Sequence, residues 1–149
     1  MIDGIIAAHP DKFARGDSPE MIENNFEKGL ISLPMGMENG APLITLDDIR
    51  YYYSKGIRYV TLTHGKDNHI CDSSYDTTAT WGGLSPYGLK AIAEMNNIGM
   101  IIDVSHISDK TFYQVMEHSR APVLATHSSC RYFTPGWERN MSDEMIIEL

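Results

Sequence analysis

Four side chains that can bind a metal ion or move a proton each follow a short apolar segment of the chain. They are Glu38 after residues 30–37, His64 after residues 57–63, His106 after residues 100–104 and one serine, and His127 after residues 122–126. Neutral imidazole is the commonest side-chain metal ligand, and a carboxylate can bridge two metal ions. A single histidine at such a position is usually a plain hydrogen-bonding residue. The repetition of the position favours a shared metal or acid–base site.

Three further polar side chains are weaker candidates for the same site. Asp103 either orients the imidazole of His106 from behind or only forms hydrogen bonds at the end of its own strand. Arg139 either holds a substrate carboxylate through paired hydrogen bonds or forms an ion pair with Glu138 in solvent. His69 belongs to a long polar loop and would line the site if that loop folds over it.

The remaining histidines, serines and cysteines are expected to have structural or surface roles. His9 and His118 are expected on the surface, on or beside helices. The pair Ser128-Ser129 is expected to cap the following helix rather than line the site. Cys71 and Cys130 are too few for a disulfide framework, so two free thiols are expected.

Helical and extended segments alternate along the chain, and this alternation must position the candidate residues. Serine or threonine caps and first-turn prolines indicate where helices begin, and glycines indicate where they end. The expected helices are 20–28, 46–55, 86–98, 108–119 and one that begins at Ser142, and the expected strands are 30–37, 57–63, 100–104 and 122–126. This order predicts a parallel sheet covered by helices, in which the carboxyl ends of the strands share one edge.

Length and charge exclude several classes of protein. The chain has 149 residues, with 12 Lys and Arg against 20 Asp and Glu, and a formal net charge of −8. An acidic chain without a basic cluster argues against a nucleic-acid partner, and no apolar run approaches the ~20 residues that span a bilayer. The first residues make a poor secretory signal. The sequence leaves the compartment open. The length suits one ordinary domain and falls short of the roughly 250 residues typical of a (β/α)8 barrel.

The motifs at these positions resemble those of the membrane (renal) dipeptidase family of zinc metallopeptidases. The matching stretches are Met37-Glu-Asn-Gly40, Tyr59-Val-Thr-Leu-Thr-His64, Gly83-Leu-Ser-Pro-Tyr-Gly88, residues 94–106 ending in Asp103-Val-Ser-His106, residues 121–129 around Thr126-His127, and Glu138-Arg-Asn-Met-Ser-Asp143. They occur in the family's order and cover the chain from about residue 20 onward. As a set they are far more specific than any single histidine.

The resemblance implies a fold, an activity and a role for each matched residue. The family is a (β/α)8 barrel that holds two zinc ions and hydrolyses dipeptides, in some members with a D-residue at the C-terminal position. By resemblance, Glu38 bridges the two zinc ions, and His106 and His127 bind the second of them. His64 contacts the substrate and stabilises the tetrahedral intermediate, and Arg139 holds the substrate carboxylate.

The sequence also departs from the family pattern. The family's first-strand His-x-Asp, which completes the first zinc site, and its late Asp have no counterpart in the matched stretches. Glu38-Asn39-Gly40-Ala41 stands where the family has Glu-Gly-Gly-His. Residues 1–149 are therefore expected to form one partial barrel domain of about four strand–helix units, roughly the middle half of the family's barrel.

Two alternatives to a dipeptidase stay open at this point. The first is a catalytically incomplete half-barrel that only binds metal or depends on a partner. Open sheet edges in such a half-barrel favour self-association into homo-oligomers. The second alternative is a related metallohydrolase, such as an amidohydrolase acting on cyclic amides, which the combination of Thr-Leu-Thr-His, Asp-Val-Ser-His and Glu-Arg-Asn disfavours.

Overall fold

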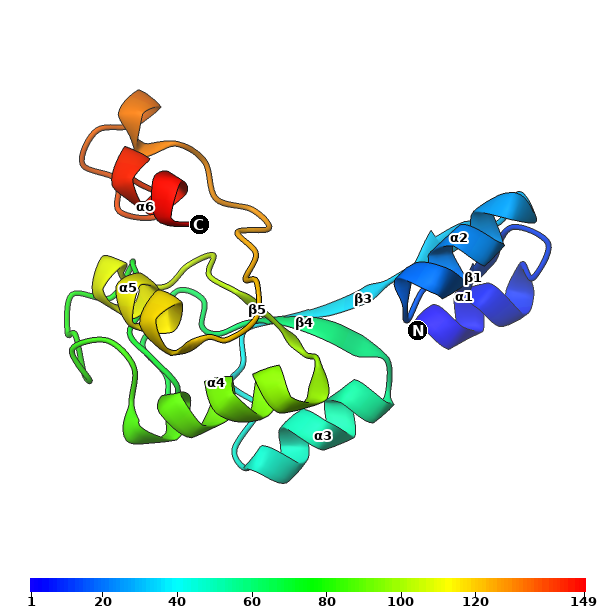
Figure 1. Ribbon diagram of the computed structural model, residues 1–149, viewed down its shortest axis with the longest axis horizontal. Helices are drawn as coiled ribbons and strands as arrows, with labels where there is room; N and C mark the ends of the chain where they lie inside the picture. The colour runs from blue at the N-terminus through cyan, green and yellow to red at the C-terminus, as the bar shows by residue number, and fades with distance from the viewer.

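Helices and short parallel strands alternate along the chain in the computed structural model, which describes all 149 residues (Figure 1). The helices are α1 (Ile2–Ala8), α2 (Pro19–Glu27), α3 (Leu46–Ser54), α4 (Pro86–Ile98), α5 (Asp109–His118) and α6 (Asp143–Glu148), with one 3₁₀ turn, η1 (Arg131–Phe133). The strands are β1 (Phe13–Arg15), β2 (Ile31–Leu33), β3 (Met35–Glu38), β4 (Ile57–Thr61) and β5 (Ile101–Asp103). None of the helices combines the length and the apolar character that crossing a bilayer requires.

The parallel sheet β3-β4-β5 sets the positions of the polar residues near its carboxyl edge. Glu38 is paired in register with Thr61, and Thr61 with Asp103. Residues in register point to the same face of a sheet, so these three side chains share one face. Their neighbours Val60 and Ile102, also paired in register, are buried on the opposite face, which α3 and α4 cover (Figure 1).

The apolar core lies between this sheet and the helices α3, α4 and α5. Its largest fully buried side chains include Phe112, Ile49, Ile92 and Met95. The first fully buried apolar residue along the chain is Leu43, and of the residues before it only the partly buried Met37 packs against this core. The elements that position the candidate site are therefore anchored by packing in the central part of the chain.

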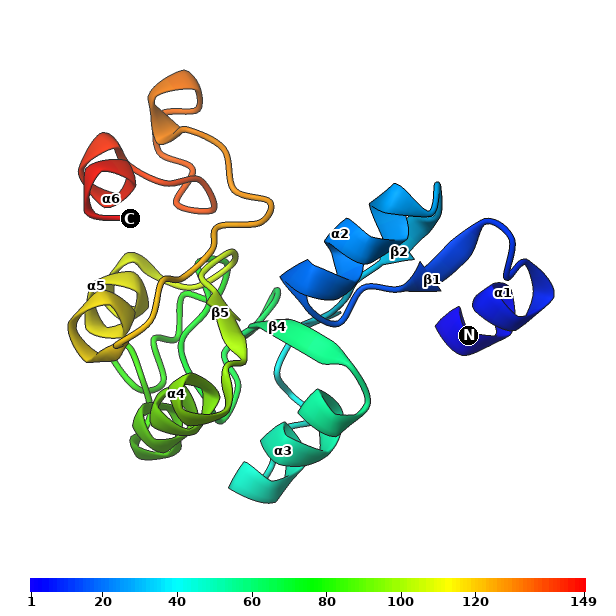
Figure 2. The same ribbon diagram turned by 45° about the vertical axis from the view of Figure 1, so that its right-hand side comes forward.

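The N-terminal unit consists of α1, α2 and the two-stranded parallel sheet β1-β2, and it lies to one side of the three-stranded sheet (Figures 1 and 2). Arginine side chains join it to the rest of the chain. Arg58 Nε donates to the carbonyl oxygen of Asp17 at 2.7 Å, and Arg15 Nη2 donates to that of Lys55 at 2.7 Å.

The helix starts and stops expected from the sequence are confirmed. The side chain of each N-cap residue accepts a hydrogen bond from a backbone N–H in the first turn of its helix; these residues are Ser18, Thr45, Ser85, Ser108 and Ser142. Thr45 and Asp48 form a complete capping box. Gly99 ends α4 with a φ of 79°, in the left-handed region that glycine adopts without a steric penalty.

Four local expectations are wrong. The strand expected over 30–37 is two strands, because Pro34 lacks an N–H and separates β2 from β3. The strand expected over 122–126 is a single bridge between Leu124 and Asp103. Pro122 has no N–H to offer there, and the N–H of Thr126 donates to the side chain of Asp103. The elements α1 and β1 were not expected at all.

The fourth wrong expectation concerns the cap after residue 127. The next element is η1, its N-cap is Cys130, and no side chain caps it. Ser128 Oγ instead accepts a hydrogen bond from Arg139, and the N–H of Ser129 donates to the side chain of Asn140. The two cysteines are free, as expected.

Candidate metal centre

The structure brings Glu38 and three histidines into one cluster. Glu38 Oε1 lies 3.0 Å from His106 Nε2, 3.1 Å from His127 Nε2 and 3.5 Å from His64 Nε2. The two imidazole nitrogens His106 Nε2 and His127 Nε2 are 2.9 Å apart. The ligand atoms of Glu38, His64 and His106 all lie within 4.8 Å of one another, a spacing that one metal ion can bind.

The parallel strands explain this convergence. Glu38 is the last residue of β3, His64 follows β4, and His106 follows β5. His127 follows the bridge that adds Leu124 to the edge of β5. All four residues therefore leave the sheet at the carboxyl ends of neighbouring extended segments, where parallel α/β folds place their ligands.

His106 occupies an uncommon backbone conformation that directs it into the cluster. Its φ is 71°, which places a bulky residue in the left-handed region. The turn is held by the N–H of Ser74, which donates to the carbonyl oxygen of His106 at 2.8 Å, and by the N–H of Ser105, which donates to Asp103 Oδ1. Such strain persists where the surroundings fix it, and it concentrates at functional sites.

The cluster favours a neutral imidazole beside an ionised carboxylate. Burial is the main reason that the pKa of His106 falls to about 4, and the positive charges of Arg139, His64 and His127 lower it further against the opposing effect of Glu38. Burial would raise the pKa of the Glu38 carboxyl. The side-chain contact with His127 and the positive charges of the three histidines in their protonated forms outweigh burial and lower that pKa. These are the protonation states in which the two side chains bind metal.

Asp103 lies behind the cluster, on the side of His127. It has no exposed surface, and its carboxylate accepts hydrogen bonds from the hydroxyls of Thr61 and Thr126 and from the N–H groups of Ser105 and Thr126. Burial would raise its pKa, but these hydrogen bonds lower it. The imidazole in contact with Asp103 is that of His127, at 3.8 Å from Nδ1 to Oδ2; no hydrogen bond joins Asp103 to His106.

Arg139 holds the segment that carries His127. Its Nη2 donates to the carbonyl oxygen of His127 at 2.9 Å, and its Nη1 donates to Ser128 Oγ at 3.1 Å. The ion pair with Glu138 that the sequence left open does not form. Three of the five N–H groups of the guanidinium therefore remain for another partner.

Sequence reasoning missed three residues of the site. Thr61 and Thr126 contact Asp103, and the ring of Tyr75 lies over that of His106 with 5.9 Å between their centroids. Thr126 directly precedes His127 in a matched stretch and could have been noticed there. Tyr75 stands in a long loop without periodicity, so no sequence signal indicated where its ring would lie.

The remaining histidines lie elsewhere. His69 Nε2 is 2.7 Å from the carbonyl oxygen of Leu43, and its ring packs on Tyr87, so the loop does not bring it to the cluster. His9 and His118 are exposed, as expected.

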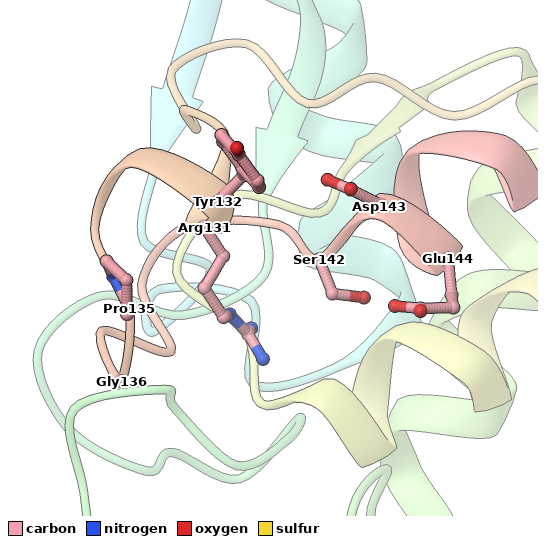
Figure 3. Close-up of a pocket in the computed structure, with 7 residues that line it drawn as sticks. All are labelled: Arg131, Tyr132, Pro135, Gly136, Ser142, Asp143 and Glu144. Carbon is pink, nitrogen blue, oxygen red and sulfur yellow. The ribbon is translucent and has the colours of Figure 1, made fainter.

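A separate hollow of about 410 Å³ lies at the start of α6 (Figure 3). Its lining residues are Arg131, Tyr132, Pro135, Gly136, Ser142, Asp143 and Glu144, none of which belongs to the cluster. The guanidinium of Arg131 already binds Asp109 through two hydrogen bonds of 2.6 and 2.7 Å. The cluster, rather than this hollow, brings together side chains that could hold a metal ion.

The donor set fits a divalent transition metal. Three imidazole nitrogens and a carboxylate oxygen are ligands that zinc accepts. The unprotonated forms of Glu38 Oε1, His106 Nε2 and His127 Nε2 all present lone pairs toward one point. Either protons shared between these atoms or a bound cation must offset the repulsion among the lone pairs. The other ring nitrogen of His106, Nδ1, is buried without a hydrogen-bond partner.

An α/β chain whose parallel strands end in imidazoles and a carboxylate belongs to a class typical of metal-dependent hydrolases. Comparison with known families agrees. Residues 1–149 match the family described as membrane dipeptidase (peptidase family M19), and the chain belongs to this family of metallopeptidases.

Named relatives and solved structures support the assignment. An uncharacterized dipeptidase of Schizosaccharomyces pombe is 36% identical in an alignment of 148 positions that covers 95% of this chain and 34% of the relative. The probable dipeptidase PvdM from Pseudomonas aeruginosa superimposes with a TM-score of 0.93 at 32% identity, over 99% of this chain and 38% of that one. A metallopeptidase from Rhodobacter sphaeroides, liganded with a phosphinate mimic of the dipeptide L-Ala-D-Ala, superimposes with a TM-score of 0.80 at 25% identity. The match covers 91% of this chain and 40% of that one. The chain spans about a third of the length of the curated relatives it matches.

Proposed function

We propose that this chain is the metal-binding part of a zinc-dependent dipeptidase, which hydrolyses the peptide bond of dipeptides. The observation that carries the proposal is the convergence of Glu38 Oε1 with the Nε2 atoms of three histidines within 3.5 Å, in a chain of the membrane dipeptidase family. Residues 1–149 would form a partial domain of a (β/α)8 barrel, covering roughly its middle half.

Dipeptides are the substrate class that the relatives favour. The Rhodobacter sphaeroides metallopeptidase is bound to a mimic of L-Ala-D-Ala, and its fold matches this chain over 91% of the residues. We therefore include dipeptides with a C-terminal D-residue among the proposed substrates. This part of the proposal rests on the family and not on a substrate pocket.

Glu38, His106 and His127 would hold the metal. Glu38 has two carboxylate oxygens, so it can bridge two ions, and the two histidines can bind one of them. Zinc bound there supplies Lewis-acid activation of water and of the scissile carbonyl. The low pKa of His106 keeps its imidazole neutral and free to bind.

His64 and Arg139 would act on the substrate. The side chain of His64 is 53% exposed, and its ring lies 4.4 Å from that of His106, so it can reach a substrate held at the cluster. It would donate a hydrogen bond to the oxyanion that develops during hydrolysis. Arg139 would direct its free N–H groups to the substrate carboxylate, and this contact would select substrates of dipeptide length.

An assay of the zinc-loaded chain tests these roles. L-Ala-L-Ala and L-Ala-D-Ala should be cleaved and tri-alanine spared. We expect His64→Ala to lower kcat by about 100-fold, as loss of one oxyanion donor does. Arg139→Ala should mainly raise KM, and His118→Ala, which changes an exposed histidine far from the cluster, should leave both constants unchanged. Unchanged turnover after His64→Ala or Arg139→Ala would remove that residue from the mechanism.

One observation favours a second candidate, a metal-binding half-barrel that depends on a partner. The sheets are open, and the apolar side chains of Ile31, Ile101 and Leu124 are 58%, 37% and 42% exposed along them. Exposed sheet edges and apolar faces favour association. Size-exclusion chromatography with zinc analysis separates the two cases, because a monomer that holds two tightly bound zinc ions and cleaves dipeptides would contradict the half-barrel.

A further inference from the structure

A chain of hydrogen bonds runs from the buried carboxylate of Asp103 through Thr126 to the imidazole of His127. Thr126 Oγ1 lies 2.6 Å from Asp103 Oδ2 and 2.6 Å from His127 Nδ1. The opposite nitrogen, His127 Nε2, faces Glu38 and His106 at 3.1 and 2.9 Å. The hydroxyl of Thr126 is therefore the link between a fixed negative charge and one of the cluster's imidazoles.

The direction of each hydrogen bond follows from the surroundings of Asp103. Oδ1 accepts the backbone N–H groups of Ser105 and Thr126, both at 3.0 Å, and N–H groups can only donate. Oδ2 faces the hydroxyls of Thr61 and Thr126 at 2.5 and 2.6 Å, and the side chain has no exposed surface. A carboxylate in this position accepts both hydroxyl protons. Thr126 has only one such proton, so its oxygen accepts from the N–H at His127 Nδ1.

We propose that Thr126 is a positioning residue that fixes the tautomer of His127, with the proton on Nδ1 and the lone pair of Nε2 directed toward Glu38 and His106. The inference rests on the proposed function only where it says that this tautomer serves metal binding. The tautomer itself is a property of the metal-free chain. A ligand histidine commonly donates its other N–H to a carboxylate or carbonyl, which fixes the ring and raises its basicity. Here a threonine hydroxyl stands between the imidazole and the carboxylate.

His106 provides an internal contrast. Its Nδ1 is buried without any hydrogen-bond partner, so only the contacts of its Nε2 can select its tautomer. Its Nε2 proton can be shared with the lone pair of His127 Nε2 at 2.9 Å or with Glu38 at 3.0 Å. The metal-free cluster is therefore consistent with a single arrangement, in which His106 donates and His127 accepts.

A structural role for Thr126 makes a different prediction. Its backbone N–H anchors the segment to Asp103 whatever the side chain, so Thr126→Val keeps this bond and the shape of the side chain but removes the hydroxyl. Thr126→Ser keeps the hydroxyl and removes the methyl group. If Thr126 only packs or anchors, both variants should leave the tautomer of His127 as it is.

The test is the ¹⁵N chemical shifts of His127 in the metal-free full chain at about pH 8, above the ordinary imidazole pKa of about 6.5. We expect a protonated Nδ1 and an unprotonated Nε2 in the parent and in Thr126→Ser. The side chain of His127 is 41% exposed in the parent, so in Thr126→Val water can take the place of the hydroxyl at Nδ1 and either donate to it or accept from it, and this preference should be lost. A proton on Nε2 in the parent, or an unchanged pattern in Thr126→Val, overturns the inference. If Thr126→Val does not fold, the parent and Thr126→Ser decide it: a proton on Nε2 in either overturns it.

Binding of Zn²⁺ alone gives a second, independent measurement. Loss of a group that supports a metal ligand typically weakens affinity by about 10–100-fold, and we expect this range for Thr126→Val. Thr126→Ser should stay close to the parent. If the parent shows the expected tautomer but does not bind Zn²⁺, the proposed function fails and the inference about Thr126 stands. If Zn²⁺ binds with equal affinity to the parent and to Thr126→Val, the positioning role is overturned while the metal site stands.

Discussion

Glu38 Oε1 lies 3.0 Å from His106 Nε2, although the two residues are 68 positions apart in the chain. The register of β3, β4 and β5 produces this contact, since it aligns Glu38 with Thr61 and Thr61 with Asp103. The left-handed turn at His106 then directs the imidazole back toward Glu38. The contact therefore depends on the sheet, and the sheet depends on the core packed behind it.

The first prediction concerns the charge of Glu38. Glu38→Gln keeps the shape of the side chain but removes the negative charge that faces the three histidines, so we expect a large loss of Zn²⁺ affinity. Isothermal titration of the metal-free chain with Zn²⁺ measures it. Glu27→Gln, an exposed glutamate at the end of α2, is the matched control and should bind as the parent does. Equal affinities of the parent and Glu38→Gln would place the metal elsewhere.

The sequence was sufficient to predict five of the six α-helices, all but α1, and the convergence of the strand ends, and the reasons are local. Caps such as Thr45 with Asp48, and stops such as Gly99, act through neighbouring residues and are visible in the sequence. The division of one strand at Pro34 also has a visible cause, although its consequence depends on which neighbours the two halves pair with.

The details of the site depend on contacts between distant segments, which no local pattern reveals. The sequence left open whether Asp103 orients His106 or only forms hydrogen bonds at the end of its strand, and the strand register turns it toward Thr61 and the Thr126-His127 segment. The placement of Tyr75 over His106 depends on how a long irregular loop folds back. Residue types and spacing therefore predicted which residues would meet, and the tertiary structure decided which atoms touch.

The second prediction concerns the buried carboxylate of Asp103 and pH. Asp103→Asn replaces an acceptor of four hydrogen bonds with a group that also donates, so we expect a loss of about 1–3 kcal/mol in the free energy of unfolding near neutral pH. The pKa of Asp103 is lowered in the folded state, so its stabilising effect is present above the unfolded pKa of about 3.9 and is lost as the pH falls through the folded pKa.

Urea unfolding of the parent and of Asp103→Asn over a range of pH checks this. The difference between the two free energies of unfolding should be constant from about pH 7 to about pH 5 and should shrink below the ordinary aspartate pKa. A difference that grows on acidification would show that the folded chain holds Asp103 in its protonated form.

The third prediction concerns the capping box of α3. The side chain of Thr45 accepts from the N–H of Asp48, and Asp48 Oδ2 accepts from the N–H of Thr45 at 2.7 Å. Thr45→Ala removes the first of these bonds, so we expect a loss of about 1 kcal/mol in the free energy of unfolding. Thr77→Ala, in an exposed loop, is the control and should stay within about 0.5 kcal/mol of the parent. Equal losses in both variants would mean that the cap does not stabilise the fold.

The fourth prediction concerns Gly88, in the first turn of α4. A Cβ built there would lie only 2.2 Å from the backbone carbonyl oxygen of Ile70, so the helix can pack against the loop before it only because residue 88 has no side chain. Gly88→Ala must push apart α4 and this loop, and overpacking of this kind costs about 1–3 kcal/mol or more.

Gly4→Ala is the matched control, because Gly4 also lies in a helix, α1, and a Cβ there meets no atom within 4 Å. Alanine is the better helix former by about 1 kcal/mol, so this variant should be as stable as the parent or slightly more so. The two substitutions are chemically identical, so opposite changes in the urea midpoint would isolate the close approach of α4 to Ile70 as the cause. Stabilisation by Gly88→Ala would mean that the loop moves freely away from α4. The placement of the segment between His64 and α4 would then not depend on this contact.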